Sequence, residues 1–281
     1  MKPFFSIIIP AYNASKTIDD TLKSVLDQSF ADYEILLIND GSTDDTLWQL
    51  ETFKQTNPTL LVNIFSQENS GLGASRNLGI KNSNGRFIAF LDADDTWHKD
   101  KLAVCKSILD RQDPGILYHS MESSINGNSF TRPAQKHQSI KDLLLNGSSI
   151  IPSATVIKRS IATSHLFSTE PQFHGVEDLD LWIRLLRKEV QFMHIPKILG
   201  HYHEESGMSK NLNEHISHFR NLLQYLLEQE FIDLTTCKKA MKRKYYEIAR
   251  FYHKRKQLKL AMKYYLKAPE ILPKKLLERL H

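Results

Sequence analysis

The chain has 281 residues, of which 41% are hydrophobic and 25% charged, a composition that fits a globular protein and excludes disordered, collagen-like and disulfide-rich classes. The length predicts one large domain with an appendage or two domains, with a core that needs no covalent staples. The two cysteines, Cys105 and Cys237, show neither CxxC nor zinc-ligand spacing, and no segment has the length of a signal peptide or membrane span. We therefore expect a cytoplasmic protein.

The net charge of +5 is unevenly distributed. Residues 1–210 carry a net charge of −4 and residues 211–281 a net charge of +9. A basic helical tail indicates either an acidic partner or a solvated helical face. We expect the tail to associate peripherally with the inner face of a membrane or to mediate oligomerisation, and we expect no nucleic acid partner.

The first 110 residues alternate between strand and helix patterns. Asn13 or Ser15 is the expected cap of the first helix and Ser42 that of the second. Alternation of this kind predicts a mainly parallel sheet flanked by helices, with ligands outside the carboxyl ends of the strands. Strands are predicted at 4–10, 33–40, 60–67 and 86–95, and helices at 13–29, 42–55, 71–85 and 99–112.

Three of these strands end in polar or turn-forming residues, namely 10–12, 39–42 and 92–95, and we expect them to line one crevice.

Beyond residue 110 the pattern is less regular. Residues 126–139 have a loop composition, and residues from about 213 onward read as helical. Strands are predicted at 115–121, 153–160, 191–196 and 198–203, and a helix at 175–189.

The tail contains one unit that resembles a tetratricopeptide repeat, which predicts a helical hairpin docked on the main domain or on a partner. An ordinary amphipathic hairpin produces the same spacing. The matching positions are Tyr245, Ile248, Ala249, Tyr252, Ala261, Tyr265, Ala268 and Pro273.

The stretch FLDADD (90–95) places three carboxylates behind an apolar run. On an extended backbone Asp92 and Asp94 point to the same side, where they repel each other unless a cation lies between them. The motif therefore favours Mn²⁺ or Mg²⁺, which keeps open positions for phosphate oxygens, and we expect the offsetting charge to arrive with the ligand. Asp95 is expected to cap the next helix or to support the site from behind. The alternative is a solvated loop.

The same letters fit the hhhDxDxT motif of haloacid-dehalogenase-like phosphatases. That motif normally closes the first strand of its domain, whereas three strand–helix units precede it here. We therefore disfavour a phosphatase.

Five segments in order resemble the family-2 inverting glycosyltransferases over roughly three quarters of the chain. They are SIIIPAYNASKTIDDTLKSVLDQSFADYEILLINDGSTDDT, GLGASRNLGI, FLDADD, GVEDLDLWIRL and HYHEESGMS. The resemblance implies a GT-A type, Rossmann-like α/β domain over residues 1–210, followed by a basic helical extension over 211–281. It also implies transfer of a sugar, from a UDP-sugar by default, to an acceptor hydroxyl in the assembly of a surface polysaccharide, lipooligosaccharide or other glycan.

The resemblance further implies roles for individual residues. Asp178 is the catalytic base, Glu177 positions it, and Asp94 and His203 hold the Mn²⁺ or Mg²⁺. We expect only one of His201 and His203 to face the cleft, because they alternate along a strand. The nucleotide-sugar is bound by Pro10, Ala11 and Tyr12 around the base, Asp40 at the ring N–H, Arg76 at the base or phosphates, and Asp92 at the ribose. Ala93 also belongs to the nucleotide-binding set.

Each residue also has a purely structural interpretation. Tyr12 can simply be packed, Asp40 can organise the turn at Gly41, and Arg76 can pair with a carboxylate. Glu177 and Asp178 can act only on the electrostatics of a helix N-terminus.

Two other functions stay open. A metal-dependent nucleotidyltransferase shares the carboxylates and the sheet, although the loop after the first strand, PAYNASKT, lacks the glycines typical of that class. A catalytically inactive nucleotide-sugar-binding subunit would keep the fold without turnover. We expect a hexosyl- or N-acetylhexosaminyl-transferase acting on a glycan or lipid-linked acceptor.

Overall fold

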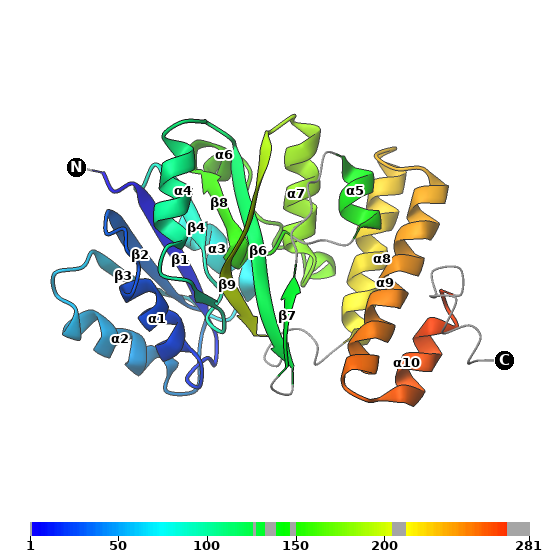
Figure 1. The fold of residues 1–281 in the computed structure, drawn as a ribbon, viewed down its shortest axis with the longest axis horizontal. Coiled ribbons are helices and arrows are strands. Elements are labelled where there is room, and N and C mark those ends of the chain that lie inside the picture. The colour runs from blue at the N-terminus through cyan, green and yellow to red at the C-terminus, as the bar shows by residue number, and fades with distance from the viewer. Residues whose placement is uncertain (1, 126–127, 133–138, 147–149, 204–211, 269–281) are drawn as a thin grey trace.

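The computed structural model describes residues 2–125, 128–132, 139–146, 150–203 and 212–268. One mixed sheet runs through its centre in the order β3-β2-β1-β4-β8-β6-β9-β5, with β7 paired to β6 (Figure 1). The first half is parallel, as the strand–helix alternation predicts, and consists of β1 (Phe5–Ala11), β2 (Tyr33–Asn39), β3 (Val62–Ser66) and β4 (Phe87–Phe90).

The second half of the sheet is mixed. The strands β6 and β9 are parallel to each other, whereas β8 is antiparallel to β4 and β6, and β5 is antiparallel to β9. The strands of this half are β5 (Thr96–Trp97), β6 (Ile116–Ile125), β7 (Asn128–Arg132), β8 (Thr155–Lys158) and β9 (Phe192–His203).

Two local predictions for this half were wrong. Residues 128–132, expected in a loop, form β7 on the edge of β6. The segment predicted as two strands forms one continuous strand, β9 (Phe192–His203). His119 pairs with Ile195 and Ser120 with Ile198, so Pro196 and Lys197 lie in a bulge. A proline interrupts a strand pattern in the sequence, and a bulge accommodates it without ending the strand.

Helices cover both faces of the sheet, and alternate residues of β1 point to different layers. Ile8 belongs to the core cluster formed with α3 and α7, whereas Ile7 and Ile9 belong to the cluster formed with α1 and α4. The helices of this part are α1 (Ile18–Leu26), α2 (Thr46–Thr56), α3 (Gly71–Asn82), α4 (Lys101–Leu109), α5 (Ile140–Leu145), α6 (Arg159–Ser164) and α7 (Glu177–Arg187), with the short 3₁₀ helices η1 (Pro152–Ala154) and η2 (Pro171–Phe173).

The predicted helix caps were wrong. Helix α1 begins at Ile18, and the side chain of Asn13 instead accepts the backbone N–H of Thr43 at 2.8 Å. Helix α2 begins at Thr46, and the Ser42 hydroxyl accepts the backbone N–H of Asn13 at 3.1 Å. Both side chains therefore join the loops after β1 and β2 rather than capping their own helices.

Three helices follow, α8 (Leu212–Glu228), α9 (Leu234–Lys254) and α10 (Leu258–Tyr265), and lie together at the end of the molecule away from α2 and β3 (Figure 1). Helix α8 packs on η2, and its buried Leu222 and Leu223 belong to the same core cluster as α7. The predicted domain boundary at residue 210 lies outside the described residues and stays a prediction, while the core cluster includes residues of both α7 and α8.

The predicted helical hairpin is present in α9 and α10. Its repeat-like positions from Tyr245 to Tyr265 share one cluster with Ile216 of α8, and the rings of Tyr252 and Tyr264 stack 5.7 Å apart. Pro273 lies outside the described residues. Within the described part of the chain, no helix is both long and apolar enough to cross a membrane.

Candidate functional site

The ends of β1, β2 and β4 meet at one edge of the sheet. Ala11 is in register with Asn39, and the backbone N–H of Asp40 donates to the carbonyl of Ala11 at 2.9 Å. On the other side of β1, the backbone N–H of Leu91 donates to the carbonyl of Ile8 at 3.0 Å. The three strand ends predicted to line a crevice are therefore neighbours.

The residues that end β1 differ in what they offer to a ligand. Pro10 and Ala11 are buried within the sheet, whereas Tyr12 keeps 50% of its surface exposed. An exposed ring at a strand end is available for stacking against a flat ligand. The role of all three residues at a nucleotide base stays a prediction.

Asp40 is buried and organises the loop between β3 and α3. Its carboxylate accepts the side-chain amide of Gln67 at 2.6 Å and the backbone N–H groups of Ser70 and Gly71, both at 2.9 Å. It thus satisfies donors at the start of α3 that lack intrahelical partners. Asp40 therefore stabilises the β3–α3 loop as well as lying next to the turn at Gly41. Its contact with the ring N–H of a nucleotide base stays a prediction.

Arg76 on α3 is buried and joins two carboxylates from distant parts of the chain. It donates to Asp92 at 2.7 Å and to Glu177 at 3.1 Å, and its guanidinium lies 5.3 Å from the centre of the Phe167 ring. Burial lowers the pKa of Arg76, but the facing carboxylates outweigh this effect and raise it above its ordinary value. The ion-pair network is therefore charged and fixed.

This network corrects one expectation about FLDADD. The charge that offsets Asp92 does not wait for a ligand, because Arg76 already supplies it. Arg76 is itself buried and pairs with the buried Glu177 and the partly buried Asp92, so a direct contact with the base or phosphates stays a prediction.

The backbone of the FLDADD motif also differs from the extended form that we assumed. The N–H of Asp95 donates to the carbonyl of Asp92 at 3.0 Å, which closes a turn. Asp92 then reaches Arg76, while Asp94 lines a separate cavity.

Asp95 is not a helix cap. Helix α4 begins only at Lys101, and the Asp95 carboxylate is fully buried, with one oxygen accepting the backbone N–H of His203 at 3.0 Å. Burial, followed by Asp94 and Asp92, raises the pKa of Asp95. It therefore ties the end of β9 to the turn from behind.

Glu177 and Asp178 begin α7 and differ in their partners. Glu177 binds Arg76, whereas Asp178 has no ion pair within the described residues and accepts the backbone N–H of Leu179 at 2.7 Å. Burial, followed by the neighbouring Glu177, raises the pKa of Asp178 to about 7. A carboxylate with a pKa near neutrality suits a general base.

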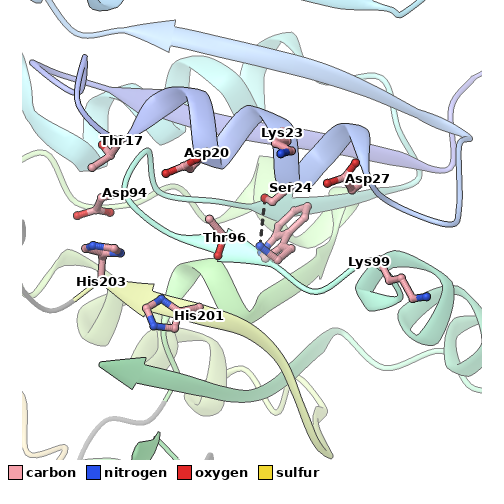
Figure 2. Close-up of a pocket in the computed structure, with 11 residues that line it drawn as sticks. Thr17, Asp20, Lys23, Ser24, Asp27, Asp94, Thr96, Lys99, His201 and His203 are labelled. Carbon is pink, nitrogen blue, oxygen red and sulfur yellow. Dashed lines mark hydrogen bonds between the residues drawn. The ribbon is translucent and has the colours of Figure 1, made fainter. Parts of the chain in front are cut away.

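A cavity of about 430 Å³ opens beside Asp94, between α1, β5 and β9 (Figure 2). Asp94 and His203 face each other across one end of it, and His201 lies further along β9. At its floor the backbone N–H of Trp97 donates to the Ser24 hydroxyl at 3.1 Å.

Both histidines line this cavity, and their ring centres are 5.6 Å apart. The expectation that only one would face the cleft was wrong, because residues two apart on a strand point to the same side.

The side chains of Asp94 and His203 suit a divalent cation as a partial ligand set. Mn²⁺ and Mg²⁺ prefer oxygen ligands such as the Asp94 carboxylate and commonly complete their coordination with substrate phosphates and water, and the His203 imidazole suits Mn²⁺ better than Mg²⁺. Among the described residues, no group of three or more His, Cys, Asp or Glu side chains could hold a metal. The residues therefore fit an ion that arrives with a diphosphate rather than one held in a protein cage.

Sequence reasoning missed the contribution of α1 to this cavity. Polar side chains of α1 and its two flanking residues line the cavity, and they recur at helical spacing opposite the apolar face of the helix. This polar stripe is the sequence pattern from which the contribution of α1 could have been predicted. Its members are Thr17, Asp20, Ser24 and Asp27. The pairing of Arg76 with Glu177, 101 residues apart, left no local signal.

Comparison with known proteins adds to this geometry. Residues 6–167, more than half of the chain, match the sequence model described as "Glycosyl transferase family 2". The chain is 32% identical over 210 residues to the amylovoran biosynthesis glycosyltransferase AmsB of Erwinia amylovora, covering 71% of this chain and 69% of AmsB. It is 34% identical over 183 residues to WfgD of Escherichia coli, a UDP-Glc:α-D-GlcNAc-diphosphoundecaprenol β-1,3-glucosyltransferase, covering 65% of this chain and 69% of WfgD.

Solved structures show the same fold. TarS (residues 1–349) of S. aureus superposes with a TM-score of 0.61 at 21% identity, covering 89% of this chain and 73% of TarS. The mannosyltransferase PcManGT of Pyrobaculum calidifontis, solved with GDP-Man and Mn²⁺, gives a TM-score of 0.62 at 16% identity, covering 97% of this chain and 77% of that one. The predicted GT-A architecture is thus confirmed, and the chain belongs to glycosyl transferase family 2.

Proposed function

We propose that this glycosyltransferase uses a divalent metal to transfer a sugar from a nucleoside-diphosphate sugar to an acceptor hydroxyl, with inversion at the anomeric carbon. The observation that carries the proposal is the arrangement around Arg76. This buried cation holds Asp92 and Glu177, while the adjacent Asp178 has no ion pair among the described residues and has a raised pKa. One carboxylate is thereby kept as a base, separate from the Asp94 cavity.

In this reaction the acceptor oxygen attacks the anomeric carbon as Asp178 takes its proton. The bond between the sugar and the diphosphate breaks with its electron pair on the diphosphate. Inversion needs a single base and no protein nucleophile, which matches one unpaired carboxylate. The ion pair of Glu177 with Arg76 holds the start of α7 in place and thereby positions the adjacent Asp178. A bound Mn²⁺ or Mg²⁺, held by Asp94 and His203, would neutralise charge on the leaving diphosphate.

We propose a UDP-sugar as the donor. Structures of TarS, which shares the fold, have been solved in complex with UDP and with UDP-GlcNAc, and WfgD is named for UDP-Glc. PcManGT, which shares the fold, was solved with GDP-Man instead. The donor screen should therefore include GDP-sugars as well as UDP-sugars. The exposed ring of Tyr12 and the loop held by Asp40 are the proposed walls of the base pocket.

For the acceptor we propose a growing surface glycan carried on a lipid diphosphate. The relatives support this class by name: AmsB acts in amylovoran biosynthesis, WfgD on a diphosphoundecaprenol-linked GlcNAc, and the putative TuaG of Bacillus subtilis in teichuronic acid biosynthesis.

The test combines donor binding with donor breakdown. Calorimetry should show that Mn²⁺ strengthens binding of UDP more than tenfold, and a hydrolysis screen over nucleotide sugars should identify one that releases UDP slowly without acceptor. No binding of any nucleoside diphosphate would contradict the proposal. Binding without turnover in the presence of acceptor extracts would favour the inactive subunit, and release of diphosphate from a nucleoside triphosphate would favour a nucleotidyltransferase.

A further inference from the structure

Helix α10 carries a row of large apolar side chains on its outer surface. Leu258 is 63% exposed, Met262 37% and Leu266, directly after the last turn, 67%. Because they are spaced by four residues, they form one continuous stripe along the helix. The helix is anchored by a different face, on which Ala261, Tyr264 and the other cluster members pack against α9. The stripe is therefore not required for folding of the hairpin.

A row of lysines runs beside this stripe. Lys259, Lys263 and Lys267 are exposed and are also spaced by four residues. Lys263 and Lys267 lie 5.9 and 5.5 Å from the centre of the Tyr264 ring. In the part of the chain that the structure describes, none of the three forms an ion pair with a carboxylate. Lys267 also lies 5.1 Å from the centre of the Tyr245 ring. The three exposed lysines are thus not neutralised by a carboxylate of the described chain.

We infer that this face of α10, the apolar stripe with its lysine row, docks the protein on an anionic membrane surface. Helices that lie in a membrane interface combine apolar side chains, which enter the acyl boundary, with lysines that contact anionic headgroups. Residues 211–281 carry a net charge of +9, which adds long-range attraction to such a surface.

Other occupants fit the face less well. A second copy of the same face would bring two lysine rows together, which costs energy. Nucleic acid would match the lysines and leave the leucines in water. An anionic lipid surface matches both rows at once. This inference goes beyond the transfer reaction, and vesicle binding tests it without any turnover.

The experiment is flotation of the full chain with phosphatidylcholine vesicles, with and without phosphatidylglycerol. Two triple variants separate the rows: Leu258→Gln, Met262→Gln and Leu266→Gln in one, and Lys259→Gln, Lys263→Gln and Lys267→Gln in the other. Leu61→Gln is the matched control, because Leu61 is 61% exposed and directly precedes β3, at the far end of the molecule from α10.

The wild type and the Leu61→Gln variant should bind vesicles that contain phosphatidylglycerol, and high salt should weaken binding. Loss of the three lysines should reduce the partition coefficient by about 100-fold, since each lysine near an anionic surface contributes a factor of about 5. Loss of the apolar stripe should reduce binding on both kinds of vesicle. All variants should keep the wild-type melting temperature and UDP binding, which separates this inference from the proposed reaction.

Three results would overturn the inference. The first is a wild-type chain that does not float with anionic vesicles, and the second is a triple variant that floats as well as the control. The third is a dimer in light scattering that the stripe variant converts to a monomer while vesicle binding stays unchanged, since the stripe would then join two copies.

Discussion

Replacing Arg76 by methionine removes the cation that Asp92 and Glu177 share. The side chains are 2%, 19% and 6% exposed for Arg76, Asp92 and Glu177, and the ion pairs measure 2.7 and 3.1 Å. Breaking a buried pair by removing one partner costs about 3–5 kcal/mol. Because one cation serves two carboxylates, we expect the free energy of unfolding to fall by about 4 kcal/mol at neutral pH.

The control is Lys106→Met. Lys106 pairs with Asp110 at 2.6 Å, but the two side chains are 29% and 48% exposed. Exposed pairs of this spacing contribute about 0.3–0.5 kcal/mol. Methionine keeps the length and apolar volume at both positions, so the comparison isolates the charge.

Urea unfolding of the wild type and both variants measures the two free energies. Arg76 also lowers the pKa of Asp178, so this variant should need a higher pH for any remaining transfer activity. A loss below about 1 kcal/mol, or one equal to that of the control, would refute a network that depends on burial.

Three further predictions concern Asp178 and the loop at Gly41. Burial and Glu177 raise the pKa of Asp178 to about 7, so kcat/KM should rise with pH and level off above about 7. Glu177→Gln removes one of these causes and should shift the pH profile of kcat/KM to lower pH. An unshifted profile would contradict this origin of the raised pKa. The native state binds the extra proton between pH of about 4 and about 7, so the contribution of this carboxyl to stability falls as pH rises through that range. Gly41 has a φ of +73°, and a Cβ there would lie 2.8 Å from the backbone N of Asn69, so Gly41→Ala should lower the free energy of unfolding by about 1–2 kcal/mol or more. An unchanged melting temperature would show that the loop adjusts freely.

The parallel half of the sheet was predictable because its signals are local. The buried strands β1, β2 and β4 are largely apolar runs, α1 has one clear apolar face, and the polar strand ends follow from sheet topology. The mixed half was harder, since the bulge at Pro196 in β9 looks like a strand end in the sequence.

The sequence identifies which residues belong to the candidate site, but it does not show which of them contact each other. Five motifs in order identified the family and its carboxylates. The pairings that hold the site, Arg76 with Glu177 and Asp95 with the backbone of His203, join residues more than 100 positions apart. Spacing along one sequence does not encode such contacts, so the pairing of Arg76 with Glu177 could not be assigned before the structure was known.

Asp178→Asn tests the central claim most directly. Asparagine keeps the shape of the side chain and its contact to Leu179, but it cannot accept the proton of the acceptor hydroxyl. We predict that transfer falls by about 10²–10⁴-fold, the usual contribution of a general base, while calorimetry shows UDP affinity within about twofold of the wild type. Transfer at close to the wild-type rate would contradict the account, because the base would then have to be another group.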